Sequence, residues 1–143
     1  MAQRFTNTLG FKEIIIQDLS EALAVLTKIK DCNPLIQLTT DEEAVGYAGV
    51  LYFQNIEKTL KKEGLLQPLI YDCGSLTGFA LEALYQRCRI IGFEGSPQAT
   101  QKLKSIANQL ESRILTPSER PTRKFVVRHH ARLEKDLLDF IAL

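Results

Sequence analysis

The sequence predicts an α/β fold with a small parallel sheet of about four or five strands and helices on its faces. Two observations lead to this prediction. Short apolar runs recur along the chain, and each is followed by a segment with helical periodicity. The runs are also nearly continuous in apolar residues, which is typical of parallel strands covered on both sides. The expected strands lie at 14–16, 35–38, 69–71 and 90–93.

Helix-start signals follow the first two runs. Asp18 and Glu21 have the spacing of a capping box, in which two side chains at a helix start bond to the backbone reciprocally. Thr40 and Glu43 repeat this spacing after the second run. Apolar residues at helical spacing come after both signals, so a helix is expected after each strand. The expected apolar stripe of the second helix consists of Ala44, Tyr47, Ala48, Val50 and Leu51.

Ser96 followed by Pro97 marks a later helix, because serine is a preferred cap and proline is favoured at the first helical position. Another helix is expected at about 78–87. Beyond residue 113 the pattern changes. We expect a loop at 116–121, a strand at 125–127 and a helix at 131–141.

The length and charge of the chain limit its organisation and its partners. With 143 residues it has the size of one domain, so we expect residues 1–143 to form one unit, in which 113–143 is a basic tail ending in a helix. The formal net charge of +1 gives no overall attraction to nucleic acid or to an anionic membrane. Acidic residues interrupt the basic tail and stacking aromatics are few, so nucleic-acid binding is not expected.

The cysteines and the first residues indicate a compartment. Cys32, Cys73 and Cys88 are three in number and irregularly spaced, which is typical of reduced thiols rather than of a disulfide framework. The N-terminus lacks the apolar core of a signal peptide, and no apolar run is long enough to span a membrane. We therefore expect a cytoplasmic protein without a membrane partner.

Candidate site residues gather where the expected strands end, because ligands of parallel sheets bind at the carboxyl ends of the strands. Asp18, Thr40 and Ser96 are explained by helix capping alone. Asp72 is not, since several residues separate it from its helix, and it is the candidate catalytic residue. The candidate ligand-binding residues at the same edge are Ser75, Thr77, Glu94, Gly95 and Ser96.

The segment from Asp72 to Gly78, together with residues 90–94, resembles the glycine loop and the acidic ribose-binding residue of class I methyltransferases. Leu76 stands where that family has its middle glycine, and the dinucleotide fingerprint G-x-G-x-x-G is absent. This resemblance implies a SAM-dependent methyltransferase-like protein.

A longer resemblance, from about Ala24 to Ile114, is to the class II (metal-dependent) fructose-bisphosphate aldolases, over the second to fourth βα units of their barrel. Residues 34–37 (PLIQ) and 43–49 (EAVGYAG) are similar to the family's PVIIQ and EGARKYAG. Residues 68–75 (PLIYDCGS) resemble PVxLHLDHGxS, and 90–96 (IIGFEGS), with Ala83 and Leu84 before them, resemble AIDAGFTSVMIDGS. The order and spacing of these segments agree with the family.

The aldolase resemblance implies roles for two adjacent residues. Asp72 falls on the family's catalytic proton-transfer aspartate, and Cys73 replaces a metal-binding histidine. A thiolate can bind zinc, so Cys73 is the candidate metal ligand and zinc the candidate cofactor. The family's other ligands lie in later barrel strands than this chain contains, so zinc is not expected to be bound. His129 and His130 lie in the tail and have no counterpart in the family.

A piece of barrel with three or four units cannot close on itself. We therefore expect either part of a TIM barrel, assembled as a homo-oligomer, or an open doubly wound sheet. The expected function is that of a non-catalytic, aldolase-like module that binds a small anionic ligand or a protein. Two alternatives stay open: a lyase of the class II aldolase type with Asp72 as its acid–base residue, and a SAM-dependent methyltransferase-like protein.

Overall fold

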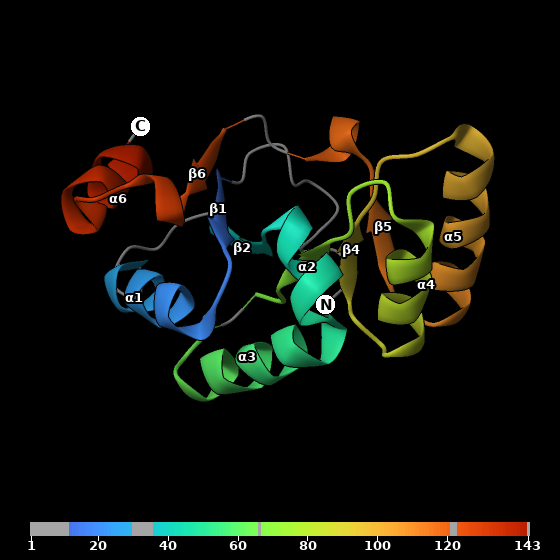
Figure 1. Ribbon diagram of the computed structural model, residues 1–143, viewed down its shortest axis with the longest axis horizontal. Coiled ribbons are helices and arrows are strands. Elements are labelled where there is room, and N and C mark those ends of the chain that lie inside the picture. The colour runs from blue at the N-terminus through green and yellow to red at the C-terminus, as the bar shows by residue number, and fades with distance from the viewer. Residues whose placement is uncertain (1–11, 30–35, 66, 121–122, 143) are drawn as a thin grey trace.

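The computed structural model describes residues 12–29, 36–65, 67–120 and 123–142. It contains a six-stranded sheet with the order β5-β4-β3-β2-β1-β6, in which every neighbouring pair of strands is parallel (Figure 1). The predicted α/β class with a parallel sheet is thus confirmed. The strands are β1 (Lys12–Ile16), β2 (Ile36–Thr40), β3 (Ile70–Asp72), β4 (Ile90–Gly92), β5 (Arg113–Leu115) and β6 (Lys124–Val126).

The helices follow the strands in the expected alternation. They are α1 (Leu19–Ile29), α2 (Glu42–Ala48), α3 (Val50–Lys62), α4 (Thr77–Tyr85), α5 (Pro97–Gln109) and α6 (Leu133–Ala142). Short 3₁₀ turns, η2 (Pro117–Glu119) and η3 (Val127–His129), lie on either side of β6. The sheet has six strands rather than four or five because β5, which has only three residues and no pattern of its own, was not expected.

The strand order is that of a β/α barrel with one pairing left open. Strands β1 to β5 follow one another across the sheet, and β6 returns to the free side of β1. In a closed barrel β6 would also pair with β5. The helices contact one another in the corresponding order α6, α1, α3, α4 and α5 (Figure 1). The expected basic tail therefore contributes to the sheet, because β5 and β6 are the strands at its two edges.

The two faces of the sheet are buried in different ways. One face joins the helices in the main hydrophobic core, to which Ile14, Leu38 and Ile91 contribute from the strands and Val25 and Phe53 from the helices. The other, which we call the inner face, combines a small apolar cluster with buried polar side chains. The buried side chains of the inner face are Glu13, Ile15, Gln37, Thr39, Ile70, Asp72, Ile90 and Leu115.

Two of the predicted helix starts are confirmed, and one is wrong. The Asp18 side chain accepts a hydrogen bond from the Glu21 N–H at 2.8 Å, and the Ser96 Oγ accepts one from the Ala99 N–H at 3.1 Å. The predicted cap Thr40 belongs to β2, and Asp41 caps α2 by accepting a hydrogen bond from the Glu43 N–H. The predicted cap is one residue too early because Thr and Asp are both good cap residues and stand next to each other here.

The second expected helix is divided at Gly49, whose φ of 91° lies in the region that favours glycine. This break changes the direction of the helix, so the predicted apolar stripe does not stay on one side. Ala44, Val50 and part of the following helix are buried, whereas Tyr47 is 72% exposed and Leu51 is 64% exposed. Within the described ranges, none of the helices has the length and apolar character needed to cross a membrane.

Candidate functional site

A cavity of about 310 Å³ lies at the carboxyl ends of β2, β3 and β4. Asp72 is the last residue of β3, Glu94 follows β4, and Glu42 is the first residue of α2. The connection between β5 and β6 forms the opposite wall. The residues that line the cavity are Glu42, Asp72, Gly74, Phe93, Glu94, Pro117, Arg120 and Lys124.

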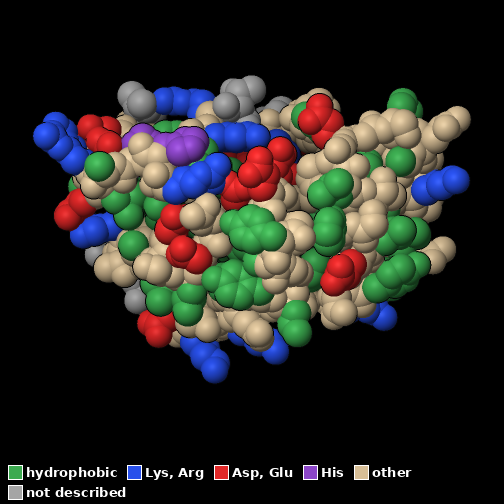
Figure 2. Space-filling model, viewed as in Figure 1, with side chains coloured by type: hydrophobic (Ala, Val, Ile, Leu, Met, Phe, Trp, Pro, Cys, Tyr) green, Lys and Arg blue, Asp and Glu red, His purple; other side chains and the backbone are tan. Residues whose placement is uncertain are grey.

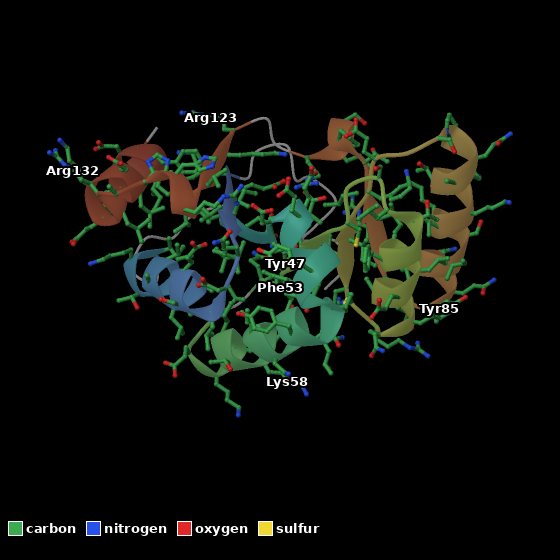
Figure 3. The ribbon with its side chains drawn as sticks, viewed as in Figure 1. Tyr47, Phe53, Lys58, Tyr85, Arg123 and Arg132 are labelled. Carbon is green, nitrogen blue, oxygen red and sulfur yellow. The ribbon has the colours of Figure 1, made fainter. Side chains whose placement is uncertain are left out.

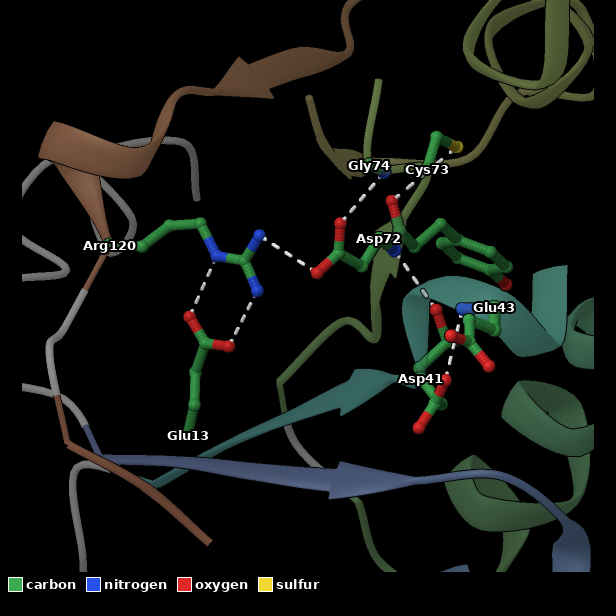
Figure 4. A network of polar contacts seen from close by, with 9 residues as sticks. Glu13, Asp41, Glu43, Asp72, Cys73, Gly74 and Arg120 are labelled. Carbon is green, nitrogen blue, oxygen red and sulfur yellow. Dashed lines mark hydrogen bonds and ion pairs between the residues drawn. The ribbon is translucent and has the colours of Figure 1, made fainter. Parts of the chain in front are cut away.

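Arg120 lines this cavity and connects two strands of the sheet, β1 and β3 (Figure 4). Its Nε donates to Glu13 Oε2 at 2.9 Å, and its Nη2 donates to Glu13 Oε1 at 2.7 Å. Its Nη1 lies 3.0 Å from Asp72 Oδ2. The guanidinium therefore binds a carboxylate of β1 with two parallel hydrogen bonds and a carboxylate of β3 with a third contact, an arrangement that arginine geometry favours.

All three charged residues of this network are buried, with exposed fractions of 8% for Arg120, 0% for Glu13 and 8% for Asp72. Burial by itself lowers the pKa of the Arg120 guanidinium, but the hydrogen bonds that Arg120 donates to Glu13 and the charge of Asp72 outweigh this effect and raise that pKa above its ordinary value. Arg120 is thus a cation held between two buried carboxyl groups.

The second oxygen of the Asp72 carboxylate is also occupied. Asp72 Oδ1 accepts a hydrogen bond from the Gly74 N–H at 3.0 Å, and the Asp72 backbone N–H donates to Thr40 Oγ1 at 2.9 Å. Both carboxylate oxygens therefore bind donors within the protein (Figure 4). The hydroxyl of Thr40, which was predicted to cap a helix, instead holds the end of β3 against β2.

Cys73 points away from the cavity. It lies in the main hydrophobic core, is 1% exposed, and its Sγ is 3.8 Å from the carbonyl oxygen of Tyr71. Burial, followed by the negative charges of Asp72 and Glu82, raises the pKa of the Cys73 thiol to about 12. A protonated thiol is neither a good nucleophile nor a good metal ligand. Among the described residues there is no group of three or more His, Cys, Asp or Glu side chains placed to hold a metal ion.

The other predicted site residues lie in three different places. Glu94 lines the cavity together with Asp72. Ser75 and Gly95 are exposed outside it. Thr77 and Ser96 line a separate groove of about 420 Å³ between α4 and α5, and Ser96 serves there as the cap of α5. The structure thus brings the predicted residues together in two pairs, Asp72 with Glu94 in the cavity and Thr77 with Ser96 in the groove.

The two histidines of the tail do not join the site. The ring of His130 stacks on Phe125 with a centroid distance of 4.0 Å, and its Nδ1 lies 3.0 Å from Asp136 Oδ2. His129 belongs to η3. These contacts hold the start of α6 against β6. Cys32, the third cysteine, lies outside the described residues.

Sequence reasoning missed Arg120, Glu13, Glu42 and Lys124. Arg120 and Glu13 are 107 positions apart, so no local pattern connects them. Glu13 does carry one signal, because an acidic residue directly before three isoleucines is an unusual start for a buried strand. Glu42, Glu94 and Lys124 make no ion pair within the described part of the chain, and their charges are available to a molecule in the cavity.

Comparison with known proteins does not place the chain in a family. No family model, no curated protein and no solved structure matches it.

Proposed function

We propose that this chain is a non-catalytic, small-ligand binding domain and that its ligand occupies the cavity at the carboxyl ends of β2, β3 and β4. One observation carries the proposal. At its floor Arg120 lies against Glu13 and Asp72, and its wall presents Glu42, Glu94 and Lys124, which make no ion pair with any residue that the structure describes. Ligand sites in parallel α/β folds lie at this end of the strands.

The strand order supports descent from an aldolase-like barrel more than from a methyltransferase-like sheet. The consecutive run from β1 to β5 is the order of barrel strands. A nucleotide-binding crevice arises where the strand order reverses. The strand β3, which precedes the glycine loop at Gly74, lies inside the unreversed run between β2 and β4.

The contacts of Asp72 support binding rather than proton transfer. An acid–base residue must exchange a proton with the substrate, which requires an oxygen that can reach it. In Asp72, Arg120 and the Gly74 N–H take one oxygen each. We propose that Asp72 is a positioning residue, which fixes Arg120 and the loop at Gly74 around the ligand.

The charges around the cavity favour a ligand with a positive group. Three carboxylates and two cations line it, and Glu13 beneath Arg120 adds a further negative charge. A sugar phosphate or another small anion would meet the carboxylates of Glu42 and Glu94, which is unfavourable in a partly enclosed space. An amine that also carries hydroxyl groups would instead find two carboxylate acceptors.

The test is ligand-observed NMR with two matched probe sets, small amines such as putrescine and amino sugars, and small anions such as a triose phosphate. We expect the amines to bind and the anions not to bind. Glu94→Gln should weaken amine binding by about tenfold, as loss of one charged contact predicts. Glu82→Gln, at an exposed glutamate of α4 outside the cavity, is the matched control and should leave binding unchanged.

Binding of the triose phosphate alone would contradict the proposal and favour the alternative, an aldolase-type lyase that uses Asp72. Metal analysis decides between these two functions independently of the ligand. An aldolase of this type needs a bound divalent metal, so stoichiometric zinc that disappears in Cys73→Ser would support the lyase. Zinc-free protein that binds amines would support the binding domain.

A further inference from the structure

The outer surface of α2, α3 and α4 carries an apolar patch that nothing in the described chain covers. Tyr47 and Leu51 are the most exposed large apolar residues of α2 and α3, and Leu76, directly before α4, is 47% exposed. A Cβ on Gly46 would lie 3.9 Å from Leu76 Cδ1 and 3.8 Å from the ring of Phe79, so these side chains adjoin the surface of α2. We call Tyr47, Leu51, Leu76 and Phe79 the apolar patch. Exposed apolar surface of this kind marks an interaction site in soluble proteins.

Opposite charges flank the apolar patch. Glu42 and Glu43 are exposed in the first turn of α2, whereas Lys58, Lys61 and Lys62 are exposed toward the end of α3. Figure 2 shows green apolar side chains at the centre of this face, with red acidic side chains above them and blue basic ones below. Figure 3 places Tyr47 at this centre and Lys58 below it. Along α2 and α3 the surface therefore changes from acidic through apolar to basic.

This order of charges makes the face complementary to itself. A two-fold axis that lies in the plane of the face, passes through the apolar patch and is perpendicular to the line from the acidic end to the basic end would bring the acidic end of one copy over the basic end of the other. The same operation would lay the two apolar patches on each other. Two-fold interfaces use one patch twice, so a surface with acidic and basic ends on opposite sides of an apolar centre satisfies the symmetry with two sets of favourable charge pairs.

We propose that a second copy of this chain binds the apolar patch and that the result is a two-fold symmetric dimer. Tyr47 and Leu51 form its apolar centre, and Glu43 of each copy faces Lys58 of the other. Glu42 at the acidic end of this face also lines the cavity at the carboxyl ends of the strands, so the proposed interface borders the ligand site. A basic or acidic partner protein would complement only one half of the face.

The first test is the solution mass by light scattering over a concentration series. We expect a dimer whose dissociation constant rises at least about 100-fold in Leu51→Glu. Each copy then contributes one buried negative charge to the apolar centre of the interface. Leu138→Glu is the matched control, since Leu138 is an exposed leucine of α6 outside the patch. It should leave the dissociation constant unchanged. A monomer at roughly millimolar chain concentration, or a dimer unaffected by Leu51→Glu, overturns the proposal.

The second test uses the charges and does not depend on apolar packing. Glu43→Lys alone and Lys58→Glu alone should each weaken the dimer, because either change sets like charges against each other at two places. The double variant Glu43→Lys/Lys58→Glu should recover the dimer, since it exchanges the two ends of the face. Circular dichroism of every variant checks that the fold is kept. If the single changes weaken association and the double variant does not restore it, the two-fold pairing is wrong.

Discussion

A Cβ atom on Gly92 would lie 2.7 Å from Nη1 of Arg120, closer than such atoms approach in proteins. Gly92 ends β4, directly beside Asp72 of β3. The guanidinium of Arg120 thus fills the space that a side chain at position 92 would need, and from there it binds Asp72 and Glu13 at the same time. The buried charge network depends on this glycine for steric reasons, and the φ of Gly92 plays no part.

Gly92→Ala should destabilise the protein by about 1–3 kcal/mol, because the added methyl group displaces Arg120 from its partners. Gly78→Ala is the matched control, since a Cβ at Gly78 meets no atom within 4 Å and the residue lies inside α4. There alanine should stabilise by up to about 1 kcal/mol through its helix propensity. Urea unfolding followed by circular dichroism measures both changes. Equal stability of the two variants would contradict the steric role of Gly92.

Arg120→Met should destabilise the protein by about 3–5 kcal/mol, because it leaves the carboxylates of Glu13 and Asp72 buried without a cation. Much of this loss should be recovered in Arg120→Met/Glu13→Gln, where one of the two unpaired charges is also removed. The free energies of the single and double variants from chemical unfolding test this coupling. Additive losses would show that Arg120 and Glu13 do not act as a pair.

The buried thiols predict a specific loss of stability in alkali. Burial raises the pKa of both Cys73 and Cys88 to about 12, from an unfolded value of 9.0. Unfolding then releases protons between these two pH values, so the native state loses about 1.4 kcal/mol per thiol for each pH unit in this window. Cys73→Ala/Cys88→Ala should show a shallower decline above pH 9 when stability is measured against pH. The slope below pH 8 should not change.

The same thiols should resist modification in the folded state. In a Cys32→Ser background, which removes the cysteine outside the described residues, a thiol reagent at pH 8 should react with denatured protein and not with native protein. The reason is that the attacking species is the thiolate, and Cys73 and Cys88 are both buried and protonated. Rapid reaction of native protein would argue against the buried position of Cys73.

Tyr71→Phe should destabilise the protein by about 1–3 kcal/mol, because it removes a hydrogen-bond donor from the buried carboxylate of Glu57. Tyr71 donates its hydroxyl to Glu57 Oε1 at 2.6 Å, and the Leu69 N–H donates to the other oxygen of the same carboxylate at 2.9 Å. Glu57 is buried, so loss of the hydroxyl leaves one carboxylate oxygen without a donor. Tyr71→Phe/Glu57→Gln should recover part of this loss in urea unfolding, and a double variant no more stable than Tyr71→Phe would count against the contact.

Local patterns were sufficient to predict most of the fold. Apolar runs located β1 to β4, and cap residues located the starts of α1 and α5, because both signals depend on residues close in sequence. The sequence-based prediction failed for features that depend on contacts between distant residues or on the path of the backbone. The exposure of Tyr47 and Leu51 depends on the bend at Gly49, and β5 is too short to show a period.

The candidate site was predictable only in part for the same reason. Asp72 and Glu94 could be placed at one edge because both follow apolar runs in a parallel sheet. The residue that binds Asp72, Arg120, lies in a loop without any motif, and its other partner Glu13 is at the opposite end of the chain. The side of β3 on which Cys73 lies also had to come from the structure.

Because β6 lies beside β1, the sheet cannot be completed until β6 has been synthesised. Until Arg120 leaves the ribosome, Glu13 has no cation to bind, and burying β1 would mean burying an isolated carboxylate. A nascent chain should therefore keep β1 in contact with water while the units from β2 to β5 begin to form. The pairing of the first strand with the last, rather than any local helix, should then limit the rate of folding, as contacts of long sequence separation do in other small domains.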